Sequence, residues 1–177
     1  MKKSITSELN RYLKELDRNE LENEVKKLYS KFDQVKKYYE MELSPDTSGI
    51  LNEYKNKIKQ EYFPNRGFGK ARSGESRKII SEFKKISIFK KDVIELLLYR
   101  VEMMIEFSNA YGGIDEPFYN SLESSFKEAC KTIQEEKLEQ EYGAACRELI
   151  ERTYSTGWGV SDGLEYIYED YLGDLGI

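Results

Sequence analysis

The stretch from Asp92 to Phe107, DVIELLLYRVEMMIEF, constrains the fold more than any other part of the chain. If it is one helix, its apolar side chains cover an arc of roughly 220°. A surface helix needs only about half that width, so other elements should cover this helix on most sides. Glu95, Glu102 and Glu106 fall together opposite the arc, where we expect the helix to open to water.

Arg100 projects from the middle of this apolar arc. An unpaired guanidinium there would cost several kcal/mol, so the side chain must reach water along its stem or meet an acceptor. A core arginine satisfied by an internal acid is the simpler interpretation. An anchor for a bound anion is the alternative.

The composition of the 177-residue chain describes one sizeable globular domain, with 39% hydrophobic and 34% charged residues. A net charge of −5 argues against a general nucleic-acid binder. Histidine is absent from the sequence, which excludes histidine-based nucleophile systems and every metal site that needs imidazole. We therefore expect neither a cofactor nor a metal.

Both cysteines, Cys130 and Cys146, fall on apolar helix faces, which favours free buried thiols in a reducing compartment. The start, MKKSITSELNRYL, has no apolar signal-peptide core, and charged residues interrupt every apolar run before it could span a bilayer. We expect a cytoplasmic protein that does not contact membranes.

Apolar residues recur at helical spacing along the whole chain, and no segment alternates with a period of two. Asp17 with Glu20 resembles a capping box, and Asp115 with Pro117 suits a helix start. The sequence predicts an all-α fold of about eight to nine helices, built as stacked antiparallel helical hairpins or an irregular bundle. We expect residues 1–177 to form a single domain, with a possible N-terminal helical subregion 1–63 joined by a basic loop 64–74.

The segment from Pro64 to Arg77 gathers basic residues and glycines in an otherwise acidic chain. Glycines allow backbone N–H groups to converge on an anion, and arginine can bind a carboxylate or phosphate with two hydrogen bonds. It is neither a P-loop nor a dinucleotide fingerprint, because the residues required at the key positions differ. A solvated basic connector explains the segment about equally well. The candidate ligand-binding residues here are Arg66, Gly67, Phe68, Gly69, Lys70 and Arg72.

Three further groups are candidates. Asp115, Glu116 and Tyr119 could form an acid/base set, although helix capping accounts for the two acids more simply. Trp158, between two glycines, could be a recognition platform, but a core plug is the simpler interpretation. Glu102 and Glu106, one turn apart, could begin a metal site, but a solvated stripe is favoured.

The segments EYFPNRGFGKAR, NAYGGIDEPFYNS and TGWG, in this order and spacing, resemble a bacterial family catalogued only as a domain of unknown function. The resemblance covers nearly the whole chain. It implies a small bacterial cytoplasmic protein, and it implies nothing about catalysis.

The sequence supports three functional hypotheses. The first is a binding or adaptor protein that presents the basic loop, with Arg100 behind it, to an acidic or phosphorylated protein or another small anionic ligand. The second is an enzyme acting on a phosphorylated or carboxylated small molecule, with the loop as a clamp and Asp115, Glu116 or Tyr119 as acid/base. A nucleic-acid module is the least favoured because of the net charge.

Overall fold

The computed structural model describes residues 5–156 and 159–173. Over these ranges the chain forms nine helices and no strand, which confirms the predicted all-α class. The helices are α1 (Ile5–Glu15), α2 (Arg18–Lys31), α3 (Asp33–Leu43), α4 (Ser48–Tyr62), α5 (Ser73–Ile86), α6 (Lys90–Tyr111), α7 (Glu116–Glu136), α8 (Glu139–Glu151) and α9 (Val160–Leu172).

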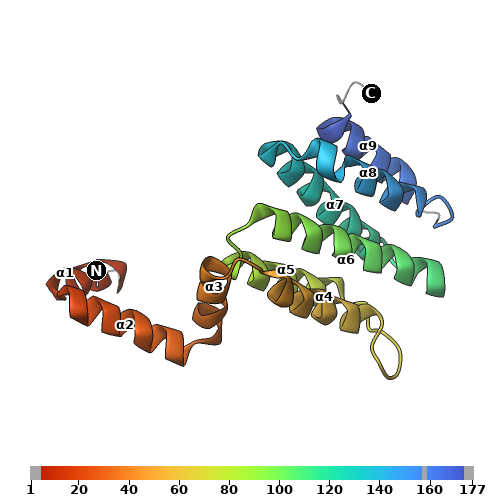
Figure 1. The fold of residues 1–177 in the computed structure, drawn as a ribbon. Helices are drawn as coiled ribbons and strands as arrows, with labels where there is room; N and C mark the ends of the chain where they lie inside the picture. The colour runs from red at the N-terminus through yellow and green to blue at the C-terminus, as the bar shows by residue number, and fades with distance from the viewer. Residues whose placement is uncertain (1–4, 157–158, 174–177) are drawn as a thin grey trace.

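Three helical hairpins form the body of the molecule and lie in layers (Figure 1). The pair α4 and α5 forms one layer, α6 and α7 the middle, and α8 and α9 the opposite layer. Helix α6 contacts helices on both sides, namely α4 and α5 below it and α7 and α8. Its apolar side chains are buried along the whole helix, as its wide apolar arc predicted. The stacked-hairpin prediction is therefore confirmed.

Local signals set several helix ends. Asp17 accepts a hydrogen bond from the backbone of Glu20, whose side chain accepts one in return from the backbone of Asp17, so the predicted capping box at α2 is confirmed. Asp115 caps α7 by accepting a hydrogen bond from the Phe118 N–H, and a proline lies in the first turn. Helix α6 ends at Gly112, whose φ of 86° suits glycine far better than a residue with a side chain.

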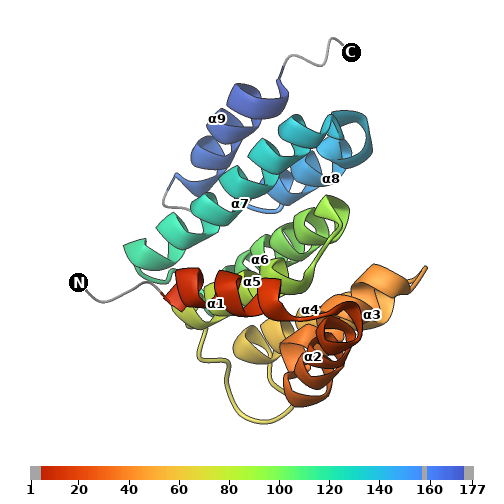
Figure 2. The same ribbon diagram turned by 90° about the vertical axis from the view of Figure 1, so that its left-hand side faces the viewer.

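Residues 5–32, which we call the arm, project away from the body in Figure 1 and lie on the side that faces the viewer in Figure 2. In α1 and α2, whose residues are all described, no side chain is buried. Helix α3 turns the chain back toward the body, packs against α5 and buries Met41. The large apolar side chains that the arm exposes are Ile5, Leu9, Tyr12, Leu13, Leu21, Val25, Leu28, Tyr29 and Phe32.

The body, in contrast, encloses most of its apolar side chains, and its exposed large ones are single residues such as Phe68, Phe89 and Tyr166. Cys130 and Cys146 are free and buried, as their positions on apolar faces predicted. Hydrogen bonding with Cys146 and burial raise the pKa of the Cys130 thiol far above its usual range. Within the described residues, no helix combines the length and the apolar character that crossing a bilayer requires.

Candidate functional site

The connection between α4 and α5 is residues 63–72, so the last two residues of the predicted basic loop 64–74 belong to α5. This connection, for which we keep the name basic loop, folds back onto the end of α4. The Ala71 N–H donates to the carbonyl of Glu61 at 3.1 Å, and Ala71 has a φ of 46°. Gly69 passes so close to α4 that a Cβ on it would lie 1.8 Å from the carbonyl oxygen of Tyr62. The loop therefore has a conformation that only glycine permits at position 69.

Arg72 binds Glu61 through three hydrogen bonds. Its Nε lies 2.9 Å from Oε1, its Nη2 lies 3.0 Å from Oε2, and its backbone N–H donates to Oε1 at 3.0 Å. The hydrogen bond from Arg72 is the main cause of the lowered pKa of Glu61. The loop thus already holds an anion, which is the carboxylate of Glu61. Arg72 and its backbone N–H are engaged inside the protein.

The outer edge of the loop carries the remaining basic candidates. Arg66 and Lys70 are exposed, and neither forms an ion pair with another described residue. Phe68 between them is 84% exposed and meets Tyr111 edge-on, with ring centroids 6.3 Å apart. Tyr111 in turn packs against Phe107 of α6 at 4.7 Å. We call Arg66, Phe68, Lys70 and Tyr111 the loop edge.

Arg100 is fully buried, and all five of its N–H donors are used. Nε donates to Ser76 Oγ at 2.8 Å, and Nη1 donates to the Ser121 carbonyl at 3.2 Å and to Ser125 Oγ. Nη2 donates to the Ser73 carbonyl at 3.1 Å and to Ser121 Oγ at 2.8 Å. Burial lowers the pKa of Arg100.

These contacts correct the expectation of an internal acid. The partners of Arg100 among the described residues are hydroxyls and carbonyls, and they tie the start of α5 to α6 and α7. No N–H group remains to bind a ligand, so the geometry gives no support to Arg100 as an anion anchor behind the loop.

The candidate acid/base set belongs to the turn between α6 and α7. Asp115 Oδ1 accepts from the Phe118 N–H at 3.0 Å. The buried hydroxyl of Tyr119 lies 2.8 Å from Ser108 Oγ and accepts from the Ile114 N–H. Glu116 is exposed in the first turn of α7. Trp158 lies outside the described residues.

The acidic stripe of α6 is partly covered rather than open to water. Arg152 binds Glu102 and Glu106 at 2.8 Å each, and Lys55 binds Glu95 at 3.0 Å. The bond to Glu102 is the main cause of the raised pKa of Arg152. No group of three or more histidine, cysteine or acidic residues within the described ranges could hold a metal ion.

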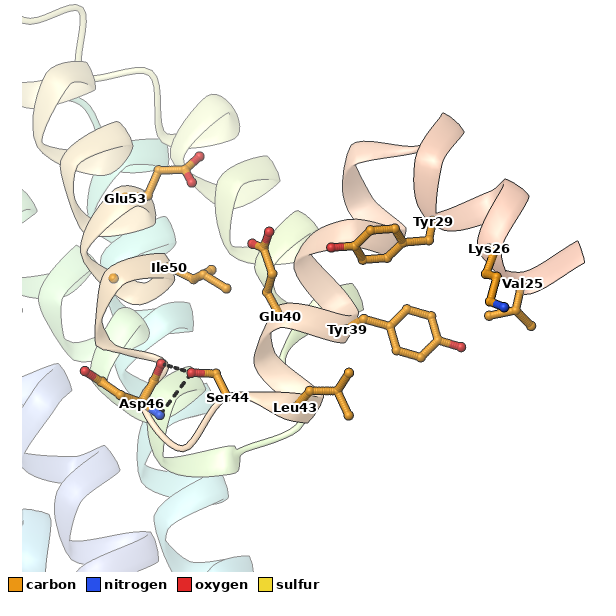
Figure 3. Close-up of a pocket in the computed structure, with 11 residues that line it drawn as sticks. Val25, Lys26, Tyr29, Tyr39, Glu40, Leu43, Ser44, Asp46, Ile50 and Glu53 are labelled. Carbon is orange, nitrogen blue, oxygen red and sulfur yellow. Dashed lines mark hydrogen bonds between the residues drawn. The ribbon is translucent and has the colours of Figure 1, made fainter. Parts of the chain in front are cut away.

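A concavity lies elsewhere, where the arm meets the body. It is a groove of about 690 Å³ between α2, α3 and the start of α4 (Figure 3). Val25 and Tyr29 of α2 form one wall, Tyr39 and Leu43 of α3 the next, and Ile50 of α4 closes it. The groove was not predicted from the sequence, because each helix contributes only part of it. Its signal in the sequence is the apolar stripe of residues 21–32.

The rim of the groove is acidic. Glu40, Asp46 and Glu53 line it with a single cation, Lys26. Hydrogen bonds from Ser48 lower the pKa of Asp46, and the bond from Lys37 is the main cause of the lowered pKa of Glu53. The apolar walls and the negative rim together suit an apolar helix that carries basic residues at its flank.

Comparison with known proteins gives one match. The family model described as "Family of unknown function (DUF6155)" matches residues 4–172. The chain belongs to this family. No curated protein and no solved structure matches the chain. The match therefore supports the resemblance seen in the sequence, and the family carries no activity that could be transferred.

Proposed function

We propose that this protein is an interaction module that binds another polypeptide through the arm and the groove. The observation that carries the proposal is the contrast between a helical body that encloses most of its apolar side chains and an arm with nine exposed large ones. Contiguous apolar surface of this kind, rimmed by polar groups, is typical of a protein-binding site.

The stability of the arm supports the same conclusion. Helix α1 has only 11 residues, and isolated helices shorter than about 12–15 residues are marginal in water. Most helical stability in proteins comes from packing an apolar face against a neighbour. A polypeptide that covered the apolar face of the arm would supply this packing and would add a helix to the groove.

Site-specific photo-crosslinking tests the proposal. A photoreactive amino acid at Leu43, a 78% exposed wall residue, should capture a polypeptide in cells that express the chain. The same group at Tyr166 of α9, which is 73% exposed, serves as the matched control. Val25→Glu should abolish capture at Leu43, because it places a charge in the apolar wall. Equal crosslinking yields at Leu43 and at Tyr166 would contradict the proposal.

The loop edge supports a second candidate function, the recognition of an acidic or phosphorylated partner. The observation behind it is Phe68, a highly exposed ring between two cations on a loop that Gly69 and Arg72 hold in place. Tyrosine and arginine are enriched among the residues that dominate binding energy, and the loop edge contains one of each, Tyr111 and Arg66. No observation favours the enzymatic alternative, which stays a hypothesis from the sequence.

A labelled oligoglutamate peptide, with and without a phosphoserine, tests this second candidate. Phe68→Ala and the pair Arg66→Ala with Lys70→Ala should each weaken binding about tenfold. Lys131→Ala, on the exposed face of α7, should bind like the wild type. If the loop-edge variants bind the peptide as tightly as Lys131→Ala does, this second candidate function is wrong.

A further inference from the structure

We propose that the polypeptide covering the arm is a second copy of this chain, with the two α2 helices packed antiparallel across a twofold axis. This inference rests on the proposed function and names its partner.

The apolar residues of α2 follow the spacing of a two-helix seam. Leu21, Val25, Leu28 and Phe32 are separated by four, three and four residues, which is a period of 3.5. This narrow stripe is the pattern of a coiled-coil contact rather than of a helix embedded in a globular core. All four side chains are 38–46% exposed, so the seam is available to a partner.

The charges of α2 select an antiparallel self-pairing. Its first half carries Glu20, Glu22 and Glu24 with one cation, Arg18, and its second half carries Lys26, Lys27 and Lys31 with no acidic residue. Parallel copies would place like charges side by side, which is unfavourable. Antiparallel copies place each acidic half beside the basic half of the other helix. A twofold axis repeats every such contact, so each favourable pair occurs twice.

The antiparallel arrangement also fixes which residues meet. If Val25 packs against Leu28 of the second copy, then the antiparallel register packs Leu21 against Phe32 of that copy. It then brings Glu24 to the flank opposite Lys31 of the second copy. Within one chain, Glu24 forms only an exposed i,i+3 contact with Lys27 at 3.4 Å, and the described residues offer Lys31 no acidic partner. Both charges can therefore change partners at little cost.

The available surface is on the right scale for a stable dimer. Each partner of a standard interface contributes about 800 Å². Of the nine exposed large apolar side chains of the arm, five belong to α2 and its C-cap and are 38–46% exposed, and the four on α1 can add to the surface that a second copy covers. The groove extends the seam, because Val25 belongs to both and Tyr29 lies beside it. A second α2 lying on the seam would therefore also cover this wall of the groove.

Sedimentation velocity of the full-length chain between about 1 and 100 µM tests the inference. The wild type should sediment with twice the mass of one chain. Glu24→Lys places two Lys–Lys contacts in the dimer, and Lys31→Glu places two Glu–Glu contacts there. Each single variant should therefore raise the dimer dissociation constant about tenfold. Glu135→Lys, an exposed charge reversal on α7, is the control and should leave the constant unchanged.

An equimolar mixture of Glu24→Lys and Lys31→Glu decides the orientation. Their heterodimer restores opposite charges at both contacts, so the mixture should associate like the wild type. A wild-type chain that is monomeric at 100 µM would overturn the inference, as would a mixture no tighter than its components. If the chain is monomeric and Leu43 still captures a different polypeptide, the proposed function stands and this inference alone fails.

Discussion

At the scale of single residues, Arg100 shows how a positive charge is accommodated in an apolar core. A buried ion normally requires a partner of opposite charge, or the removal from water costs several kcal/mol. Here five neutral acceptors, supplied by Ser73, Ser76, Ser121 and Ser125, take all five N–H groups. The side chain thereby joins three helices, and its role is to hold them together.

Arg100→Lys should lower the free energy of unfolding by about 2–3 kcal/mol. Lysine keeps the charge but offers three donors on a single nitrogen, so it leaves buried hydroxyls or carbonyls without a partner. Urea unfolding followed by far-UV circular dichroism measures the loss. Arg66→Lys, on the exposed loop edge, should change stability by less than about 0.5 kcal/mol. Equal stability of the two variants would contradict this role for Arg100.

The Glu61–Arg72 pair should make part of the stability depend on pH. The pKa of Glu61 is lowered in the folded protein, so below an unfolded value of about 4.3 the unfolded chain binds more protons. The contribution of Glu61 is thus present above that pH and is lost as the pH falls through the folded pKa. Unfolding measured between pH 5 and 3 should therefore show a smaller loss of stability for Glu61→Gln than for the wild type.

A double-mutant cycle isolates this pair. Arg72→Met should flatten the acid profile less than Glu61→Gln does, because the backbone N–H of residue 72 still donates to Glu61, and the double variant should flatten it no further than Glu61→Gln alone. Every variant should still lose some stability as the pH falls, because the pKa values of Glu53 and Glu75 are also lowered by lysine partners. If the free energy of unfolding of Glu61→Gln falls with pH as steeply as that of the wild type, the Glu61–Arg72 pair does not contribute to the pH dependence.

The sequence allowed only part of the site to be predicted at this scale. The position of Arg100 in the apolar arc followed from helical periodicity, and its burial agrees with that position. Its partners did not follow, because scattered serines on α5 and α7 form no recognisable pattern. Likewise, the basic composition of the loop was visible, whereas the capture of Arg72 by Glu61 depends on how the loop folds back.

At the scale of elements, the basic loop is a rigid connection between α4 and α5. Gly69 lies against the last turn of α4, and Arg72 fixes the end of the loop to Glu61. The glycine at position 69 is therefore required by close packing. Gly74, by contrast, lies in the first turn of α5 with nothing within 4 Å of an added Cβ.

Gly69→Ala and Gly74→Ala should therefore have opposite effects on stability. The Cβ of Gly69→Ala would clash with the Tyr62 carbonyl, so the loop must move, at a cost of about 2 kcal/mol. Gly74→Ala should be neutral or stabilise by up to about 1 kcal/mol, because alanine is the better helix residue. Thermal unfolding of the two variants compares them directly. A Gly69→Ala variant as stable as Gly74→Ala would contradict the close packing of the loop.

Helix positions and caps were predictable because they depend on neighbours within a few residues. The apolar stripes and the capping residues Asp17 and Asp115 gave the helices and several of their ends. The pairing of the helices into layers followed from short connections. The groove could not be predicted from the sequence, because it depends on the angle at which α2 and α3 meet, and no local pattern encodes that angle.

At the scale of the whole molecule, the body and the arm differ in how they are stabilised. The body buries its apolar side chains among α4 to α9, and its two thiols are enclosed. The arm exposes its apolar stripe and gains little packing from the body. The arm therefore needs a second polypeptide to cover its apolar stripe, and we propose that this polypeptide is a second copy of the chain.

Hydrogen exchange measured over a range of protein concentration tests this requirement most directly. Amides of α1 and α2 should exchange slowly at about 100 µM and at least tenfold faster at about 1 µM, where the partner dissociates. Amides of α6 should exchange at the same rate at both concentrations. Arm amides whose exchange is slow and independent of concentration would show that the arm is stable alone, and would contradict the account.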